Sequence, residues 1–427
     1  MHARYYPSRV LWRHQPAATA STTTGEVAVR GRLLHFTAGR GRIADESGEV
    51  DFVVKERVVG IKAGDIVELY GIVVESIIDA TQVRLLAPSS AVWHQGDWSR
   101  FHANGLWANM WVRAAVLDAV RDFFKDADFL AVETPTLILA SAQEEHIQLF
   151  ATEYQGDKVQ KQLYLAPSPE LYMKRLLGAG FERIYQISRS YRNGEMGPQH
   201  NPEFTLIEWY RAYASYEEIM ADVEDLVSHV AKSVLGRSSV VRAGREIDLQ
   251  PPWERLSVRD AFARWAAVDL DASTDAESLF RRARALGYGS ARREDSWEDL
   301  YHKILLERVE PELAKLGAIH LFDYPRQLAA LAKLKEGDSA IAERTEAYLG
   351  GVELSNGYTE LNDPAQQRER FARGARLGGA PADEAFLAAM ERGIPPAGGV
   401  ALGLDRLVMI VAGASCLDEV IAFPLGH

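Results

Sequence analysis

The chain has 427 residues and a formal net charge of −12, which argues against a protein that coats nucleic acid through a strongly basic surface. Hydrophobic residues make up 47% and charged residues 25%, a balance typical of globular proteins. The single cysteine, Cys416, excludes an internal disulfide and a multi-cysteine zinc site. The N-terminus lacks the apolar stretch of a signal peptide, and Asp405-Arg406 interrupts the apolar run 400–417. We therefore expect a soluble cytoplasmic protein without a membrane partner.

The chain divides into segments that differ in composition and in hydrophobic pattern. Residues 1–26 contain a run of small residues and predict a flexible tail. Short β-rich runs separated by glycine turns over residues 27–88 predict a small all-β barrel of the OB type. Residues 89–105 indicate a linker, and residues 106–427 form the predicted main domain. Apolar periodicity predicts that this domain opens with a helix over residues 107–129.

A hairpin with a long loop is predicted where two β-rich runs, 187–196 and 200–210, flank a segment rich in Gly, Pro and Asn. Alternation along the second run places four side chains on one face: Phe204, Leu206, Glu208 and Tyr210. A carboxylate beside a phenol suits the binding of a cation. The structural alternative is a buried Glu–Tyr pair that satisfies its own hydrogen bonds.

A second hairpin is predicted over residues 346–360, where Gly350-Gly351 suits a two-residue turn. Regular pairing across this turn places Glu346 opposite Ser355 and diagonal to Glu353. Two carboxylates held together repel unless a cation joins them, and Mg²⁺ is commonly held by one or two carboxylates plus substrate phosphates. The alternative is two glutamates on a solvated face.

A glycine-rich strand that runs into an apolar helix is predicted over residues 398–410. Glycines in such a strand allow a ligand to approach the backbone closely. Arg406 lies with Asp405 in the first helical turn, an unusual place for charge in so apolar a run. Arg406 is therefore either a ligand-binding residue or a structural arginine held by an ion pair.

Together and in this order, these blocks resemble the motifs of class II aminoacyl-tRNA synthetases. Residues 132–135 resemble motif 1, which is normally a dimer-interface element, residues 189–210 resemble motif 2, and residues 399–410 resemble motif 3. The resemblance covers about residues 106–427. It implies an α+β fold, with an antiparallel catalytic sheet flanked by helices, preceded here by the all-β OB-like barrel. It also implies a homodimer.

Residues 166–176 and 346–360 resemble the lysine subgroup of that family. In this subgroup, lysyl-tRNA synthetases carry an anticodon-binding OB domain, whereas the elongation factor P–(R)-β-lysine ligases lack it and modify a protein lysine. The core here is more similar to the ligases, at Ser168-Pro169-Glu170, at residues 419–423 and at Ala401, where the tRNA enzymes typically have glycine. The barrel is a feature of the tRNA enzymes, so the chain combines features of both.

The resemblance implies ATP-dependent activation of lysine or a lysine-like amino acid as the aminoacyl-adenylate. The favoured reading is transfer to a protein acceptor similar to elongation factor P. The alternative is the charging of tRNA with lysine, with the barrel binding the anticodon through basic residues near Phe36. These are Arg30, Arg32, His35, Arg40 and Arg42. For these basic residues, an ordinary solvated edge is the favoured explanation because the chain is acidic. A non-catalytic binding module is the third hypothesis.

The resemblance assigns roles at the ATP site. Arg192 is expected to bridge the amino-acid carboxylate and the α-phosphate, and Arg406 to hold the γ-phosphate, since guanidinium groups pair bidentately with oxyanions. Mg²⁺ is expected on Glu346 and Glu353. The full set of expected ATP-binding residues is Arg192, Asn193, Asn201, Glu353, Leu354, Gly403 and Arg406.

The resemblance also assigns the amino-acid site. The expected substrate-binding residues are Ser168, Glu170, Tyr210 and Glu360. Of these, Glu170 binds the amino group near the carboxylate end, while Tyr210 and Glu360 bind the distal ammonium. One position departs from the family: relatives usually have Glu at position 194, where it recognises the adenine amino group, and this chain has Gly194. The next residue, Glu195, is the candidate to replace it after a shift of the loop; otherwise ATP recognition is weakened.

Overall fold

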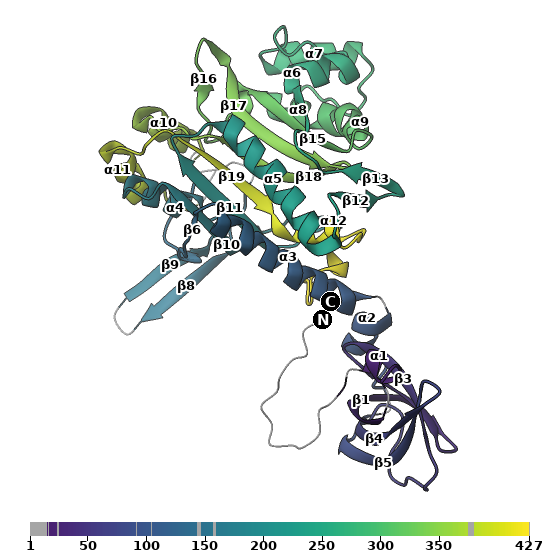
Figure 1. Cartoon of the computed structure of the whole chain (residues 1–427). Helices are drawn as coiled ribbons and strands as arrows, with labels where there is room; N and C mark the ends of the chain where they lie inside the picture. The colour runs from purple at the N-terminus through teal and green to yellow at the C-terminus, as the bar shows by residue number, and fades with distance from the viewer. Residues whose placement is uncertain are drawn as a thin grey trace. The chain divides into compact units, whose positions relative to one another are not determined.

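The computed structural model describes residues 15, 17–23, 25–90, 92–103, 105–142, 147–156, 159–374 and 380–426. Contacts divide the chain into two compact units, residues 1–107 and 108–427, which we describe separately (Figure 1). Most of the expected N-terminal tail, residues 1–14, lies outside the described residues. Within the rest of that tail, Ala17–Ala20 form the short helix α1, and both its terminal alanines are buried.

The smaller unit is a closed five-stranded barrel, which confirms the predicted all-β OB-like architecture. Its strands pair in the order β1 (Glu26–Thr37), β2 (Arg40–Asp45), β3 (Gly48–Val54), β5 (Ile77–Ala87) and β4 (Ile66–Val74). The β3–β5 pair is parallel and the other pairs are antiparallel. The predicted linker is partly helical, because α2 (Asp97–Ala103) lies in it. From α2, the Trp98 ring packs 4.7 Å from the Arg32 guanidinium.

The larger unit is built on a nine-stranded sheet, which confirms the predicted α+β fold (Figure 1). The strand order is β14 (Glu254–Ser257), β15 (Ala318–Pro325), β17 (Asp338–Leu349), β18 (Val352–Thr359), β19 (Ala397–Gly403), β11 (Glu203–Ala212), β10 (Arg183–Tyr191) and β6 (Leu130–Ala131), with β16 (Leu334–Lys335) on β17. The six central strands are antiparallel, and only the edge pairs β14–β15 and β6–β10 are parallel.

The two faces of this sheet are covered by different helices. On one face, α3 (Leu106–Asp126), α5 (Tyr216–Leu235) and α12 (Leu404–Val411) enclose the main core (Figure 1). Ile207 and Trp209 of β11 point into that core. On the other face, α4 (Glu170–Gly178), α10 (Pro364–Gly374) and α11 (Glu384–Arg392) surround a second core that includes Tyr210. Strand alternation therefore places Glu208 and Tyr210 on one face, as predicted, and that face points away from the main core.

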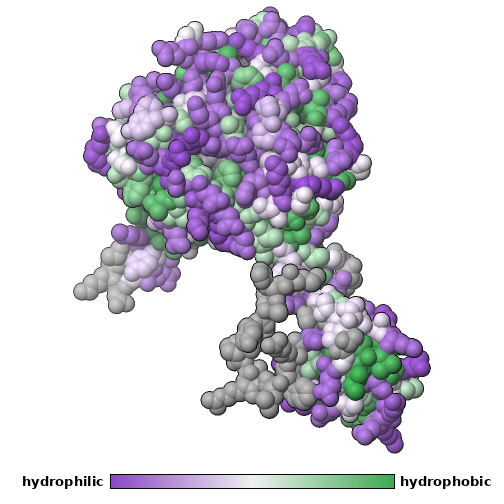
Figure 2. All heavy atoms as spheres, in the orientation of Figure 1, coloured by the Kyte–Doolittle hydropathy of each residue, from purple (hydrophilic) through white to green (hydrophobic). Residues whose placement is uncertain are grey.

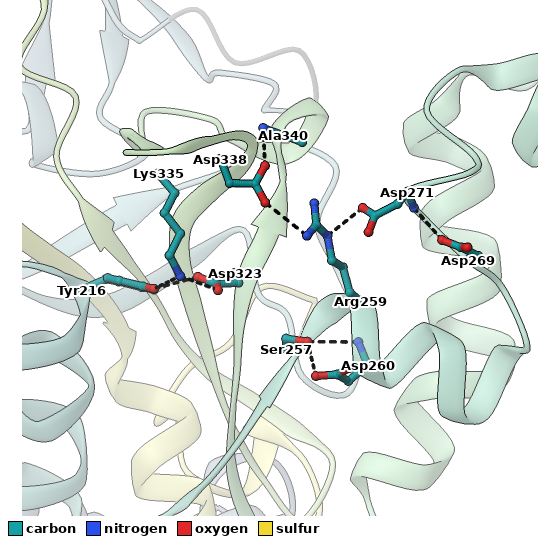
Figure 3. Close-up of polar contacts among 10 residues, drawn as sticks. All are labelled: Tyr216, Ser257, Arg259, Asp260, Asp269, Asp271, Asp323, Lys335, Asp338 and Ala340. Atoms are coloured by element: carbon teal, nitrogen blue, oxygen red, sulfur yellow. Dashed lines mark hydrogen bonds and ion pairs between the residues drawn. The ribbon is translucent and has the colours of Figure 1, made fainter.

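Helices α6 (Val258–Ala261), α7 (Ala276–Ala285), α8 (Trp297–Ile304) and α9 (Glu310–Leu313), with two π-helical turns, form a separate helical segment. Figure 3 shows Arg259 between two aspartates, with ion pairs of 2.8 Å to Asp271 and 3.3 Å to Asp338 of β17. Beside it, Lys335 pairs with Asp323 at 2.6 Å. These contacts attach the helical segment and the β16 strand to the sheet.

Five peripheral strands and two short 3-10 turns, Arg326–Leu328 and Leu417–Glu419, complete the described part of the larger unit. The strands are β7 (Leu137–Ile138), β8 (Ala151–Gly156) and β9 (Val159–Leu165) in a small sheet, and β12 (Ser239–Arg242) with β13 (Arg245–Asp248) in a hairpin. Hydrophilic residues cover most of this unit on the face drawn in Figure 2. Within the described part of the chain, no helix has both the length and the apolar character needed to cross a membrane.

The register of the β17–β18 hairpin corrects one prediction. The turn lies at Gly350-Gly351, as expected, and Leu349 pairs with Val352. A β-bulge then shifts the pairing by one residue, so that Ala347 lies opposite Ser355 and Glu346 lies opposite Asn356. The predicted pairing of Glu346 with Ser355 was wrong because regular alternation cannot anticipate an inserted residue.

Candidate active site

A cavity of about 280 Å³ lies where β11, β18 and β19 meet the start of α12. Six of the predicted ATP-site residues line it, namely Arg192, Asn201, Glu353, Leu354, Gly403 and Arg406. Other residues of its wall are Glu195, Gln199, His200, Phe204, Leu206, Ser355, Asn356, Ala401 and Asp405. Three segments widely separated in sequence thus converge on one polar cavity.

Arg406 lines the cavity from the first turn of α12. Its Nη1 donates to the backbone oxygen of Glu353 at 2.7 Å, and its Nη2 lies 2.8 Å from Nε2 of His200. Burial, together with the positive charge of Arg406, lowers the pKa of His200. A neutral imidazole at this position accepts a hydrogen bond from the guanidinium, and this bond restricts the orientation of the Arg406 side chain.

Arg192 also lines the cavity and lies just after the end of β10. Its guanidinium lies 5.3 Å from the Phe204 ring and 3.9 Å from the Glu195 carboxylate. Asn193 is not among the lining residues, and its backbone N–H donates to Gln148 at 2.8 Å. Gly194 has φ of +82°, a conformation that strains residues with a side chain. The backbone at position 194 therefore favours glycine, while Glu195 lines the cavity.

Glu346 and Glu353 occupy different environments. Glu353 lines the cavity, whereas Glu346 is buried and is not among the lining residues; it lies 2.8 Å from Arg344 and 2.9 Å from the Tyr348 hydroxyl. Burial raises the pKa of Glu346, with Arg344 opposing and Glu353 adding to the shift. Among the described residues, no group of three or more His, Cys, Asp or Glu side chains is arranged to hold a metal. Glu346 and Glu353 fit a Mg²⁺ ion only if phosphates and water supply the other ligands of the ion.

The predicted amino-acid site forms a second polar cluster on the same sheet face. Ser168 donates to Glu208 at 2.6 Å, and the Tyr210 hydroxyl donates to the other Glu208 oxygen at 3.0 Å. The Tyr358 hydroxyl donates to Glu170 at 2.5 Å. Ser168, Glu170, Tyr210 and Glu360 are brought together here, and Glu208 joins them.

Lys174 is the residue of this cluster that sequence reasoning missed. Its ammonium lies 2.5 Å from Glu170 and forms an ion pair with Glu360. Lys174 stands one helical turn after Glu170 on α4, a spacing that brings side chains together and could have indicated the pair. Its contact with Glu360, in contrast, depends on the packing of α4 against the end of β18.

An antiparallel sheet that presents two arginines to a polar cavity, beside an acidic pocket, defines a ligase of the class II synthetase type. The family model for class II tRNA synthetases of the D, K and N group matches residues 93–426. The chain therefore belongs to this family, whose members are ATP-using, aminoacyl-adenylate-forming ligases.

Individual relatives cover the chain to different extents. A lysine–tRNA ligase of Carboxydothermus hydrogenoformans is 32% identical over 93% of this chain and 88% of its own length. An elongation factor P–(R)-β-lysine ligase of Erwinia tasmaniensis is 39% identical over 74% of this chain and 94% of its own length. A lysine–tRNA ligase of Pelotomaculum thermopropionicum is 38% identical over 73% of this chain, which spans 62% of that enzyme's length.

Proposed function

We propose that the chain activates L-lysine with ATP and transfers it to tRNA. The observation that carries this proposal is the extent of similarity to lysine–tRNA ligases. The Carboxydothermus enzyme and a Moorella thermoacetica enzyme, 34% identical, both align over 93% of the chain, whereas the Erwinia ligase aligns over 74%. The sequence-based preference for a protein acceptor therefore becomes the second candidate.

In the proposed reaction, a lysine carboxylate oxygen attacks the α-phosphorus of ATP, and pyrophosphate leaves. Arg192, which lines the cavity, would hold the carboxylate and the α-phosphate together, so that their like charges do not oppose the approach. Arg406, which also lines the cavity, would bind the terminal phosphate. Its contacts with the Glu353 backbone and His200 orient the guanidinium before ATP arrives.

Glu353 and Glu346 would hold Mg²⁺ together with the ATP phosphates, and the ion would supply positive charge that stabilises the pyrophosphate leaving group. Glu195 would recognise the adenine amino group in place of the glutamate that relatives have at position 194. Its carboxylate lines the cavity, and the φ of Gly194 disfavours any side chain at that position. The side chains of Asn201 and Leu354 and the Gly403 backbone would complete the ATP site.

The acidic cluster would bind the lysine substrate. A buried carboxylate pair suits an ammonium group, because an unpaired charge in such a site is strongly unfavourable. Glu170 would take the α-ammonium, and Glu360 with Tyr210 and Glu208 would take the distal one. We further propose a homodimer through the segment that resembles motif 1 and a cytoplasmic location, where both ATP and tRNA are present.

Aminoacylation of purified lysine tRNA by the full chain, with radiolabelled L-lysine and ATP, tests this proposal. We expect acid-precipitable label that is released by mild base, as an aminoacyl ester requires. Transcribed tRNA for another amino acid is the control. Pyrophosphate exchange with lysine but no charging of lysine tRNA would contradict the proposed acceptor while leaving lysine activation in place.

The second candidate, transfer to a protein similar to elongation factor P, is favoured by Ala401. Ala401 lines the cavity and lies opposite Glu208 in the β11–β19 pair, so its methyl group restricts the space for the amino acid. Labelling of elongation factor P with L-lysine or (R)-β-lysine tests it. We expect Ala401→Gly to increase the use of L-lysine relative to (R)-β-lysine if Ala401 shapes the amino-acid pocket.

A further inference from the structure

Lys174 lies at the centre of the acidic cluster. Its side chain is 2% exposed, and it pairs with Glu170 at 2.5 Å and with Glu360, whose side chain is also 2% exposed. The Tyr358 ring lies 5.1 Å from the same ammonium. Burial alone would lower the pKa of Lys174, but its two ion pairs outweigh burial and raise the pKa. Lys174 is therefore a permanent cation inside the pocket.

The remaining carboxylate of the cluster is Glu208, which is 1% exposed and accepts from the hydroxyls of Ser168 and Tyr210. The cluster thus contains three carboxylates, Glu170, Glu208 and Glu360, and the single ammonium of Lys174. When all three carboxylates are ionised, two negative charges remain without a partner cation within the cluster. Isolated buried charges of this kind are strongly unfavourable.

We propose that Lys174 is a positioning residue that neutralises one of three buried carboxylates, so that the pocket presents two negative charges to an amino acid with two ammonium groups. The inference rests on the proposed activation of lysine and adds the reason for its selection. Lysine supplies both missing cations. An isostere with an uncharged side chain, such as norleucine, supplies one and leaves a carboxylate unpaired.

This arrangement couples substrate binding to proton release. Burial, with the nearby Glu170 charge, raises the pKa of Glu208 to about 7, against the hydrogen bonds from Ser168 and Tyr210. Burial raises the pKa of Glu360 to about 8, against the ion pair with Lys174. Without substrate, Glu360 is then mainly protonated and Glu208 partly protonated near neutral pH. The substrate ammoniums bind the ionised forms, so lysine affinity should increase as the pH rises through these two values.

The test is pyrophosphate–ATP exchange by the full chain, with KM for L-lysine and kcat measured from about pH 6.5 to about pH 9. For the wild type, we expect the KM for lysine to fall by roughly tenfold or more as the pH rises. For Lys174→Met, the loss of the cation raises both carboxylate pKa values further. KM at neutral pH should then rise by roughly ten- to a hundredfold, and its decrease should move to higher pH.

Two further variants separate charge from structure. Lys174→Arg keeps the positive charge, so its KM for lysine should level off at the same pH as that of the wild type. Lys232→Met, an exposed lysine on α5, is the matched control and should leave the whole profile unchanged. With the wild-type enzyme, norleucine should be a poor competitor of lysine at every pH.

Several results would overturn the inference. A Lys174→Met profile that is raised by the same factor at every pH assigns Lys174 a purely structural role. If that variant does not fold, a wild-type KM for lysine that stays flat across this pH range overturns the inference on its own. A wild type that shows no exchange with lysine overturns the proposed function as well, whereas exchange with a flat KM overturns only this inference.

Discussion

Arg113 and Asp405 form an ion pair of 2.6 Å that joins the first helix of the catalytic unit to its last. Asp405 also accepts from the backbone N–H of Thr205 at 2.7 Å, and Arg113 donates to the Thr205 hydroxyl at 3.0 Å. Both side chains are largely buried, with 15% and 3% exposed. This pair fixes the start of α12 against β11, and that arrangement places Arg406 in the cavity.

Replacing Arg113 by Met leaves the Asp405 charge buried without its partner. We expect the free energy of unfolding to fall by about 3 kcal/mol, the usual cost of breaking a buried pair. Urea unfolding followed by circular dichroism measures the change. Arg121→Met removes an exposed arginine of the same helix and should have little effect; equal losses in the two variants would contradict the role of the pair.

Arg406→Lys keeps the positive charge but loses the planar fork that contacts both His200 and the Glu353 backbone. We expect pyrophosphate exchange to fall by roughly a hundredfold, since Lys binds phosphate as a point charge without that orientation. Exchange at saturating ATP and lysine measures this. Arg281→Lys, at an exposed position on α7, serves as the control and should retain full activity.

Glu195→Ala tests the proposed recognition of adenine. Removing the carboxylate should raise the KM for ATP by roughly tenfold, the loss of about one charge-assisted hydrogen bond, and reduce discrimination against GTP. The comparison is Glu203→Ala, a half-exposed glutamate at the start of β11. An ATP KM that is unchanged in Glu195→Ala would mean that another group recognises the base.

Gly399→Ala should damage the amino-acid site. A Cβ at this position would lie 2.2 Å from Oε1 of Glu360 and 2.4 Å from Cε1 of Tyr210, closer than real atoms approach. We expect the KM for lysine to rise by at least roughly tenfold, with a smaller change in the KM for ATP. Gly289→Ala, where a Cβ meets no atom within 4 Å, is the control, and a similar effect of both changes would contradict the prediction.

The stability of the substrate-free protein should decrease as the pH rises. Folding raises the pKa values of Glu208 and Glu360 to about 7 and about 8, above the usual value of 4.5. The folded state therefore binds more protons than the unfolded state, so stability is lost as the pH rises from the unfolded pKa through these values. Melting temperatures with and without lysine should diverge towards alkaline pH. Glu208→Gln should weaken the decline, and an unchanged slope would argue against Glu208 as its source.

Local patterns predicted much of this molecule correctly. Alternation along residues 200–210 placed Glu208 and Tyr210 on one face of β11, and the glycine-rich run before Arg406 became β19 followed by α12. Short β-rich runs with glycine turns over residues 27–88 predicted the barrel. These features depend on side-chain periodicity and turn residues within a few positions, which the sequence displays directly.

Other features depend on contacts between distant segments, so only the tertiary structure decided them. The bulge in β18 moved Glu346 to a position opposite Asn356, because one extra residue changes every later pair. Lys174 meets Glu360 because α4 packs against the sheet, which brings a helix residue and the residue after β18 into one buried cluster. The sequence by itself determined which chemical groups are available and on which local face they lie. Packing determined which of these groups share a pocket, and hence the charge that the pocket offers to a substrate.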